Sequence, residues 1–121
     1  MNRQELGSLG ERLAQKSLKK RGYHIIETNF RCRMGEIDII AKQRDQLVFI
    51  EVRTKSNLAF GTPEESITAG KKRKLISSAL TYISTHQNTP ASWRIDFVAV
   101  EINNEGKPQR IEVIENAVNQ L

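Results

Sequence analysis

Apolar and polar positions follow two different periods along the chain, and these periods predict two helices and five strands. Between residues 3 and 21 apolar residues recur every three to four positions, which predicts a helix that ends before Gly22. Residues 69–86 show the same period, with Thr68 as the expected N-cap. The apolar stripe of this second helix is expected to consist of Leu75, Ile76, Ala79, Leu80 and Ile83.

Shorter segments that are rich in β-branched and aromatic residues predict the strands. They span residues 23–30, 36–42, 47–55, 93–102 and 110–117. The last of them is expected to be short and to lie at an edge. Residues 31–35 and 56–68 carry turn residues and are expected to be loops, the second with one short helical turn. The resulting order, α-β-β-β-α-β-β, predicts an α/β fold in which helices flank a mixed central sheet.

The length and composition indicate a soluble globular protein of one domain, which covers residues 1–121. Apolar runs are too short to cross a membrane, and the N-terminal segment lacks the apolar stretch of a secretory signal, so we expect a cytoplasmic protein. Cys32 is the one cysteine in the sequence, which excludes an internal disulfide. His24 and His86 are isolated in the sequence, which disfavours a zinc site.

The formal net charge of +5 favours an anionic partner, with nucleic acid, and DNA in particular, as the first candidate. A charge that serves solubility alone is the alternative. Basic residues gather in the loop 31–35 and at the start of the helix 69–86, where the helix dipole adds to the positive charge. The residues expected to contact nucleic acid are Arg31, Arg33, Lys71, Lys72 and Lys74.

Acidic residues interrupt the strand 36–42, which is otherwise mostly apolar. Because side chains alternate along a strand, Glu36 and Asp38 are expected to point to one face, and Ile37 and Ile39 together to the other. Glu36 lies near the start of the strand, where a solvent-facing position is the alternative to a role beside Asp38.

The strand 47–55 carries Glu51 and Arg53 on one face, and a hairpin register can place Glu51 beside Asp38. Like charges opposite each other in a sheet repel, and burial removes their hydration. Such a pair is stable if it shares a proton, pairs with cations, or binds a divalent metal such as Mg²⁺. Pairing of Glu51 with Arg53 or Lys55 at a surface is the alternative to a metal site.

Two further features of the sequence have structural explanations. Asp96 lies on the same face of its strand as Arg94, and we expect a salt bridge between them. Tyr82 and Trp93 are expected to pack in the core or at its rim rather than to stack on bases.

Six segments in a fixed order carry a resemblance to a known protein family. They are GERLAQKSLKKRGY (10–23), GEIDIIA (35–41), VFIEVRTK (48–55), FGTPEESIT (60–68), KKRKL (71–75) and RIDFVAV (94–100). With these segments the chain resembles the YraN-type family of small bacterial proteins, which has a restriction-endonuclease-like, PD-(D/E)xK fold and is related to archaeal Holliday-junction resolvases. The resemblance covers nearly the whole chain and implies an α-β-β-β-α-β core.

The resemblance also implies a metal site built on carboxylates. Asp38 is followed, after a gap of twelve residues, by Glu51-Val52-Arg53, which is similar to the family's D…(D/E)xK motif except at its last position. By this resemblance Mg²⁺ or Mn²⁺ would be held by Glu11, Asp38, Glu51 and the carbonyl of Val52. Glu36 is expected to support these ligands without touching the metal.

Arg53 occupies the position where the nuclease motif has lysine. Arginine stays protonated, so it cannot act as a general base, although it can bind a phosphate in bidentate fashion and stabilise developing charge. Lys55 points to the same face and could substitute in part. The expected catalytic residues are therefore Glu11, Asp38, Glu51, Arg53 and Lys55.

Together these features favour a Mg²⁺-dependent endonuclease that hydrolyses phosphodiester bonds in DNA, with branched or damaged DNA as candidate substrates. A catalytically inactive nucleic-acid-binding module of the same fold is one alternative, and Arg53 is the argument for it. A protein-interaction adaptor that docks through the basic helix is another. A homodimer would suit a junction-cutting enzyme, because two-fold symmetry places one site at each strand, although the sequence identifies no dimer surface.

Overall fold

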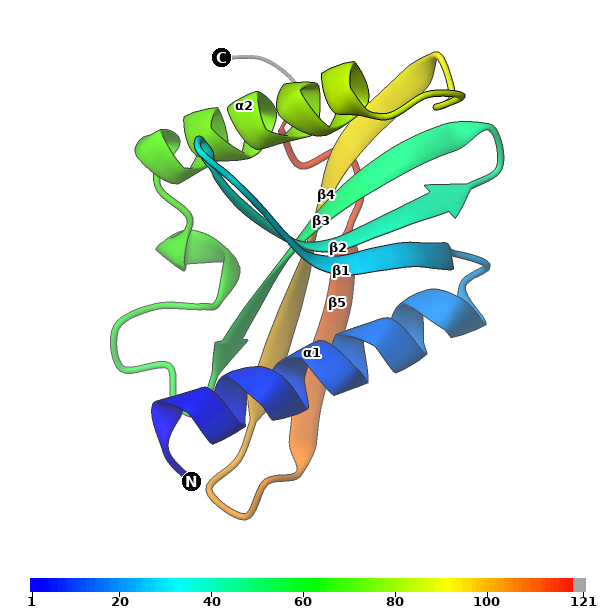
Figure 1. Ribbon diagram of the computed structural model, residues 1–121. Coiled ribbons are helices and arrows are strands. Elements are labelled where there is room, and N and C mark those ends of the chain that lie inside the picture. The colour runs from blue at the N-terminus through cyan, green and yellow to red at the C-terminus, as the bar shows by residue number, and fades with distance from the viewer. Residues whose placement is uncertain (119–121) are drawn as a thin grey trace.

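A computed structural model describes residues 1–118 as a five-stranded sheet that lies between two helices (Figure 1). The helices are α1 (Arg3–Lys20) and α2 (Ala69–Thr85), and a 3-10 turn, η1 (Glu64–Ser66), precedes α2. The strands are β1 (His24–Cys32), β2 (Gly35–Gln43), β3 (Gln46–Lys55), β4 (Ser92–Ile102) and β5 (Pro108–Ile114). This order confirms the predicted α/β class and its α-β-β-β-α-β core.

The sheet has the strand order β1-β2-β3-β4-β5, in which β3 and β4 run parallel. The other neighbouring strands are antiparallel. The chain passes from β3 to β4 through η1 and α2, so α2 covers one face of the sheet while α1 covers the opposite face (Figure 1). β5 lies at an edge, as predicted.

Each helix packs on its own apolar cluster. The cluster under α1 includes Ala14, Leu18, Ile39, Ile50, Val98 and Val100. The cluster under α2 includes Ile40, Phe49, Leu75, Ala79, Tyr82 and Phe97. Leu80 was expected on the apolar stripe, but it is 51% exposed because α2 turns Ser78 and Tyr82 toward the sheet instead. Tyr82 and Trp93 both pack edge-on against Phe49, which confirms their predicted role in the core.

Both helices begin at side-chain caps that the sequence encodes. The side chain of Asn2 accepts a 2.8 Å hydrogen bond from the Glu5 backbone N–H, and the Glu5 carboxylate accepts one from the backbone N–H of Asn2. Thr68 accepts a 3.1 Å hydrogen bond from the N–H of Lys71, which confirms it as the N-cap of α2 and fixes Lys71 in the first turn. Within residues 1–118 neither helix combines the length and apolarity needed to cross a membrane.

Helix α1 approaches β3 closely at Gly10. A methyl group built on Gly10 would lie 1.9 Å from the Oγ1 atom of Thr54 in β3, so a side chain at this position would push the helix away. The glycine therefore lets α1 rest directly on β3, and it places the next residue, Glu11, beside the end of that strand.

A buried polar network lies at the far end of the sheet from Gly10. The Nε atom of Arg94 lies 2.9 Å from Asp96 Oδ1, which confirms the predicted salt bridge. Asp96 is fully buried and also accepts hydrogen bonds from the Tyr23 hydroxyl (2.7 Å) and the Asn116 N–H (2.9 Å). Because every charge in this network is paired, its burial is compatible with a structural role.

β1 is longer than the sequence predicts. Arg31 pairs with Glu36 and Cys32 with Gly35, so the antiparallel ladder extends into the segment expected to be a loop. Arg31 therefore lies in β1, and the turn between β1 and β2 consists of Arg33 and Met34 alone.

The predicted alternation of side chains fails in the first half of β2. Ile37 packs under α2 together with Ile40, whereas Ile39 packs under α1, so Ile37 and Ile39 do not share a face. Asn29 lies in β1 between the partners of these two residues and has a positive φ of 55°. A left-handed residue inside a strand interrupts the regular alternation of side chains, and Asn29 lies opposite Asp38, where this interruption occurs.

Candidate active site

The sheet forks where β2 separates from β3. The ladder between them ends at Ile39 opposite Ile50, whereas β3 continues beside β4 as far as Lys55. Figure 1 shows the two strands diverging beyond this point, with the β1–β2 end rising toward the start of α2 and the end of β3 descending toward the start of α1. The residues just beyond the last pair, Asp38 and Glu51, therefore lie at the fork.

Asp38 and Glu51 lie side by side, as their predicted register requires. The backbone N–H of Val52, at the position where β2 leaves, donates a 2.8 Å hydrogen bond to Asp38 Oδ2. The two carboxyl groups are also within hydrogen-bonding reach of each other. Glu51 is only 3% exposed and Asp38 is partly buried, so the pair lies below the surface, with Asp38 on the side of the hollow described below.

Burial and the neighbouring charge of Asp38 raise the pKa of Glu51 to about 8. Burial also raises the pKa of Asp38, while the Val52 N–H and the hydrogen bond from Glu51 oppose that rise. Two adjacent buried carboxyl groups cannot both ionise readily. The two carboxyl groups therefore favour a state in which they hold one proton between them.

Glu11 reaches the same region from α1. Burial, followed by the charges of Asp38 and Glu36, raises the pKa of Glu11. Its Oε1 atom is buried and has no hydrogen-bond partner within residues 1–118. Glu36, by contrast, is exposed at the start of β2 and forms a 3.5 Å ion pair with Arg31. The structure thus brings Glu11 to the pair and leaves Glu36 on the surface beside it.

Two cations approach the same oxygen of Glu51. Arg53 Nε lies 3.0 Å from Glu51 Oε2, although its N–H does not point along that line and makes no hydrogen bond within residues 1–118. Lys71 Nζ, from the first turn of α2, lies 3.6 Å from the same oxygen. Lys71 was expected to contact nucleic acid, and the structure places its ammonium group beside the carboxyl pair. This lysine comes from α2, whereas the lysine of the nuclease motif would stand in β3, at the position of Arg53.

The fork opens into a hollow of about 600 Å³. Its acidic lining comes from Glu11 and Asp38, and Val52 lines it as well. The remaining walls include cationic and aromatic side chains, namely Arg3, Arg53, Lys55 and Phe60. Lys55 thus faces this hollow, as Arg53 does.

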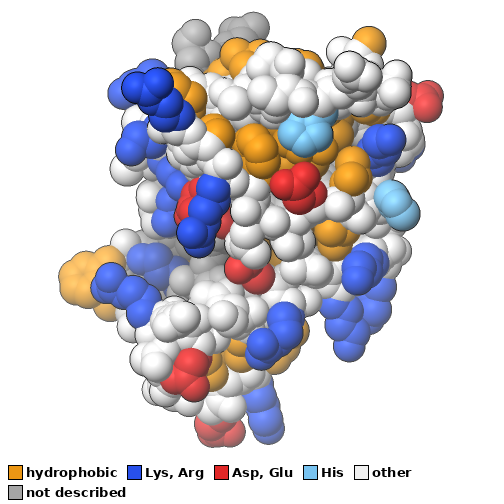
Figure 2. Space-filling view, in the orientation of Figure 1, with side chains coloured by type: hydrophobic (Ala, Val, Ile, Leu, Met, Phe, Trp, Pro, Cys, Tyr) orange, Lys and Arg blue, Asp and Glu red, His pale blue; other side chains and the backbone are white. Residues whose placement is uncertain are grey.

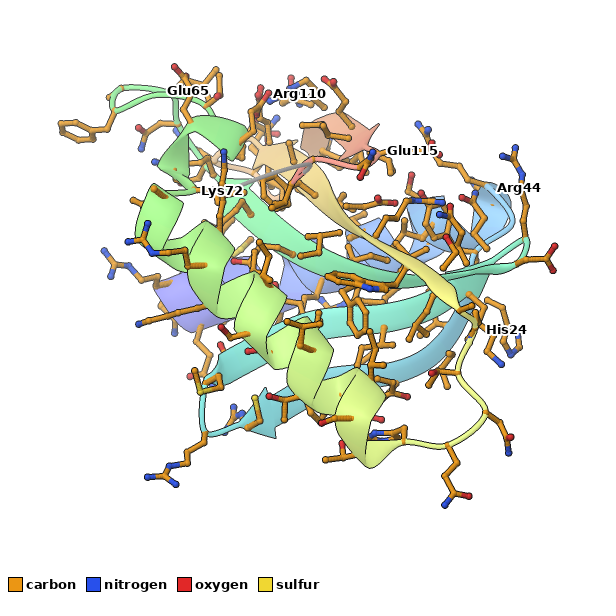
Figure 3. All side chains as sticks on the ribbon, turned by 90° about the horizontal axis from the view of Figure 1, so that it is seen from above. His24, Arg44, Glu65, Lys72, Arg110 and Glu115 are labelled. Carbon is orange, nitrogen blue, oxygen red and sulfur yellow. The ribbon has the colours of Figure 1, made fainter. Side chains whose placement is uncertain are left out.

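A second hollow, of about 430 Å³, lies on the α2 side. The residues that give it charge are Arg31, Arg33, Glu36, Lys71 and Lys74. Two basic segments that are far apart in the sequence therefore meet here, and Figure 2 shows Lys and Arg side chains along the left edge of the molecule, where these elements lie. Lys72 lies apart, near the start of α2 on the side toward Glu65 (Figure 3).

The donor set at the fork fits a hydrated divalent cation. No three Asp, Glu, His or Cys side chains within residues 1–118 converge into a complete ligand group. Mg²⁺, however, is commonly bound through one or two carboxylates, with water and phosphate as its other ligands. Asp38 and Glu51 supply such a pair, and the unpartnered Oε1 of Glu11 supplies a further oxygen nearby.

Two residues of the site carry no clear signal in the sequence. Lys71 belongs to a run of basic residues, and nothing in the sequence distinguishes it from the other lysines of that run. Its contact with Glu51 depends on how α2 docks on the sheet. Phe60 is an isolated aromatic residue in a loop, and its place in the wall of the hollow follows from the course of that loop. The segment FGTPEESIT was the available hint, because it belongs to the set that carries the family resemblance.

Comparison with known proteins identifies relatives over the whole chain. The model of the uncharacterised protein family UPF0102 matches residues 10–100. A UPF0102 protein from Dehalococcoides mccartyi is 48% identical, over 98% of this chain and 97% of its own. Proteins of that name from Caldicellulosiruptor saccharolyticus (43%; 97% and 99% covered) and Moorella thermoacetica (42%; 97% and 98%) are similar as well. These matches confirm the YraN-type resemblance, and the names state no activity.

Proposed function

We propose that this chain, which belongs to the uncharacterised protein family UPF0102, is a cytoplasmic, metal-dependent nuclease that hydrolyses phosphodiester bonds in DNA. The observation that carries the proposal is the buried Asp38–Glu51 pair at the fork of the sheet. Burying two carboxyl groups together opposes folding. Titratable groups with strongly shifted pKa values that line a hollow are typical of catalytic sites.

Asp38 and Glu51 would hold Mg²⁺ or Mn²⁺, with Glu11 and the carbonyl of Val52 as further oxygen donors. When bound, such an ion polarises the phosphate and lowers the pKa of a coordinated water. Asp38 is oriented by its hydrogen bond from the Val52 N–H, so its carboxylate is preorganised at the fork. The proton shared with Glu51 would have to leave for both carboxylates to act as ligands.

The cations at the fork are suited to the phosphate. The guanidinium group of Arg53 can donate two parallel hydrogen bonds to phosphate oxygens, where negative charge grows during an in-line displacement. Lys71 holds down the pKa of Glu51 and thereby favours its ionised form. Lys55 and Arg3 line the same hollow and attract the phosphodiester backbone. Arg31, Arg33 and Lys74 would continue this path across the second hollow.

The test is cleavage of labelled single-stranded, duplex, flapped and four-way-junction DNA in Mg²⁺, in Mn²⁺ and in EDTA. Asp38→Asn and Glu51→Gln are the variants, and Glu105→Gln, at an exposed turn, is the matched control. We expect metal-dependent cutting that falls by about a hundredfold or more in both variants and is unchanged in the control. Cutting that persists in both variants, or wild-type protein that cuts none of the DNAs, would overturn the proposal.

A binding module without catalysis is the second candidate function. Its supporting observation is that the cationic side chains of Arg53 and Lys71 already lie beside Glu51, where a metal ion would have to bind. It predicts salt-dependent DNA binding that is indifferent to EDTA and to Glu51→Gln, with no cutting.

On a junction, the nuclease would act best as a two-fold homodimer, with one fork at each of two strands.

A further inference from the structure

Phe60 is the most exposed large hydrophobic residue within residues 1–118, at 92% of its surface. It lies in the loop between β3 and η1, and Leu58, two residues earlier, is half exposed as well. On the side of the molecule where this loop lies, Figure 2 shows a hydrophobic side chain that projects from the surface between Lys and Arg side chains. An exposed ring in such a position is available for contact with another molecule.

The loop holds Phe60 at the tip of a hydrogen-bonded turn. The N–H of Gly61 donates a 3.1 Å hydrogen bond to the carbonyl of Leu58, which closes a four-residue turn with Phe60 at its third position, and Gly61 leaves this turn with a positive φ (101°). Directly after it, the N–H and the hydroxyl of Thr62 each lie 2.8 Å from Glu65 Oε1. The turn is thus tied to η1, so the fold defines where the backbone presents Phe60.

The ring stands at the wall of the hollow at the fork, which is also lined by Glu11 and by Asp38 of the carboxyl pair. Phe60 lines this hollow together with Asp38, Arg53 and Lys55. A cationic groove beside an aromatic side chain is the arrangement by which proteins bind single-stranded nucleic acid, because phosphates contact the cations and a base stacks on the ring. A protein partner fits less well, because Phe60 and Leu58 offer too little apolar area for the core of an interface.

We infer that Phe60 stacks on an unpaired base next to the phosphodiester bound at the fork, and that the site therefore selects DNA with unpaired or displaced bases over intact duplex. In a regular duplex each base is already stacked between its neighbours and paired, so it cannot lie on the ring without being displaced. This inference rests on the proposed function, since it assumes that the hollow receives a DNA strand.

The test is fluorescence anisotropy in EDTA, with single-stranded and duplex DNA of equal length and a series of NaCl concentrations. Phe60→Ala is the main variant, and Phe60→Trp keeps an aromatic face. Leu80→Ala is the matched control, because it removes a half-exposed apolar side chain from α2, away from the hollow. Because both residues are exposed, unfolding temperatures of the variants should match that of the wild type.

We expect Phe60→Ala to weaken single-strand binding by roughly tenfold to a hundredfold, and duplex binding by less than about twofold. Phe60→Trp should bind like the wild type, and Leu80→Ala should match it on both DNAs. The slope of log Kd against log[NaCl] should not change in Phe60→Ala, because no phosphate contact is removed.

Phe60→Ala that binds single strands as tightly as Leu80→Ala would overturn the inference, and so would an equal loss on both DNAs. A wild-type protein that binds neither DNA would also overturn it and would point to a protein partner for the ring. DNA cleavage that persists in Asp38→Asn would overturn the proposed function while leaving this binding comparison in place. The two ideas therefore fail by different results.

Discussion

Replacing Glu51 with glutamine should stabilise the metal-free protein at high pH. Glutamine has nearly the same shape, can still donate a hydrogen bond to Asp38, and carries no charge. The wild-type protein must either keep a proton on Glu51 or bury two adjacent negative charges. Glu51→Gln removes that choice, so it separates the effect of the buried charge on stability from the effect of side-chain packing.

The size of the effect follows from the pKa of Glu51. Its value of about 8 lies well above the ordinary 4.5, so the folded protein retains a proton that the unfolded chain releases between these two pH values. The wild type therefore loses stability as the pH rises from about 4.5 to about 8. At 1.36 kcal/mol for each pH unit the loss has an upper bound of about 5 kcal/mol. Relaxation and water entry around the ionised pair reduce it, and we expect about 2–4 kcal/mol.

The assay is urea unfolding in EDTA, followed by circular dichroism at about pH 5 and about pH 9. The free energy of unfolding of Glu51→Gln should equal that of the wild type at the lower pH and exceed it at the higher pH. Glu105→Gln, on an exposed turn, should follow the wild type at both. If Glu51→Gln and the wild type differ by the same amount at both pH values, the reasoning that Glu51 is a buried carboxyl with a raised pKa is refuted.

Two further substitutions test how the site is assembled. Gly10→Ala should lower the free energy of unfolding, measured in urea, by about 1–3 kcal/mol, because the added methyl group would lie 1.9 Å from a side-chain oxygen of β3. Gly7→Ala has open space around the new methyl group and should instead raise the free energy of unfolding by about 0.5–1 kcal/mol. Equal effects of the two substitutions would contradict the close packing of α1 on β3. Lys71→Met should move the pH midpoint of Mn²⁺ binding upward by roughly one unit, because the lost ammonium group of Lys71 lowers the pKa of Glu51. Lys72→Met is the control, and identical midpoints in the two variants would contradict a role for Lys71.

The order of elements and the carboxyl pair could be predicted because they depend on local patterns. Strand periodicity gave the faces of β3, and the hairpin register then placed Glu51 beside Asp38. The helix caps followed from side chains next to the helix starts, such as Thr68. Each of these inferences uses residues that are close together in the sequence or joined by one turn.

The fork could not be predicted, because it results from a break in periodicity. Asn29 adopts a left-handed conformation inside β1, and its effect appears across the ribbon, where Ile37 changes face. The contact of Lys71 with Glu51 likewise depends on the docking of α2 on the sheet, and no local pattern encodes that distance. The local sequence pattern therefore predicts which carboxyl groups meet at the site, whereas tertiary packing determines which charged side chains surround them.

The most direct test of the central claim is Mn²⁺ binding by the metal-free protein at about pH 8.5, with free Mn²⁺ followed by electron paramagnetic resonance. Asp38→Asn is the informative variant, because its amide oxygen can still accept the hydrogen bond from Val52 and so preserve the fork. We predict that the wild type binds Mn²⁺ and that Asp38→Asn and Glu51→Gln each weaken binding at least about tenfold, while Glu105→Gln does not. A wild-type affinity no greater than that of Asp38→Asn would contradict a metal site at the fork of the sheet.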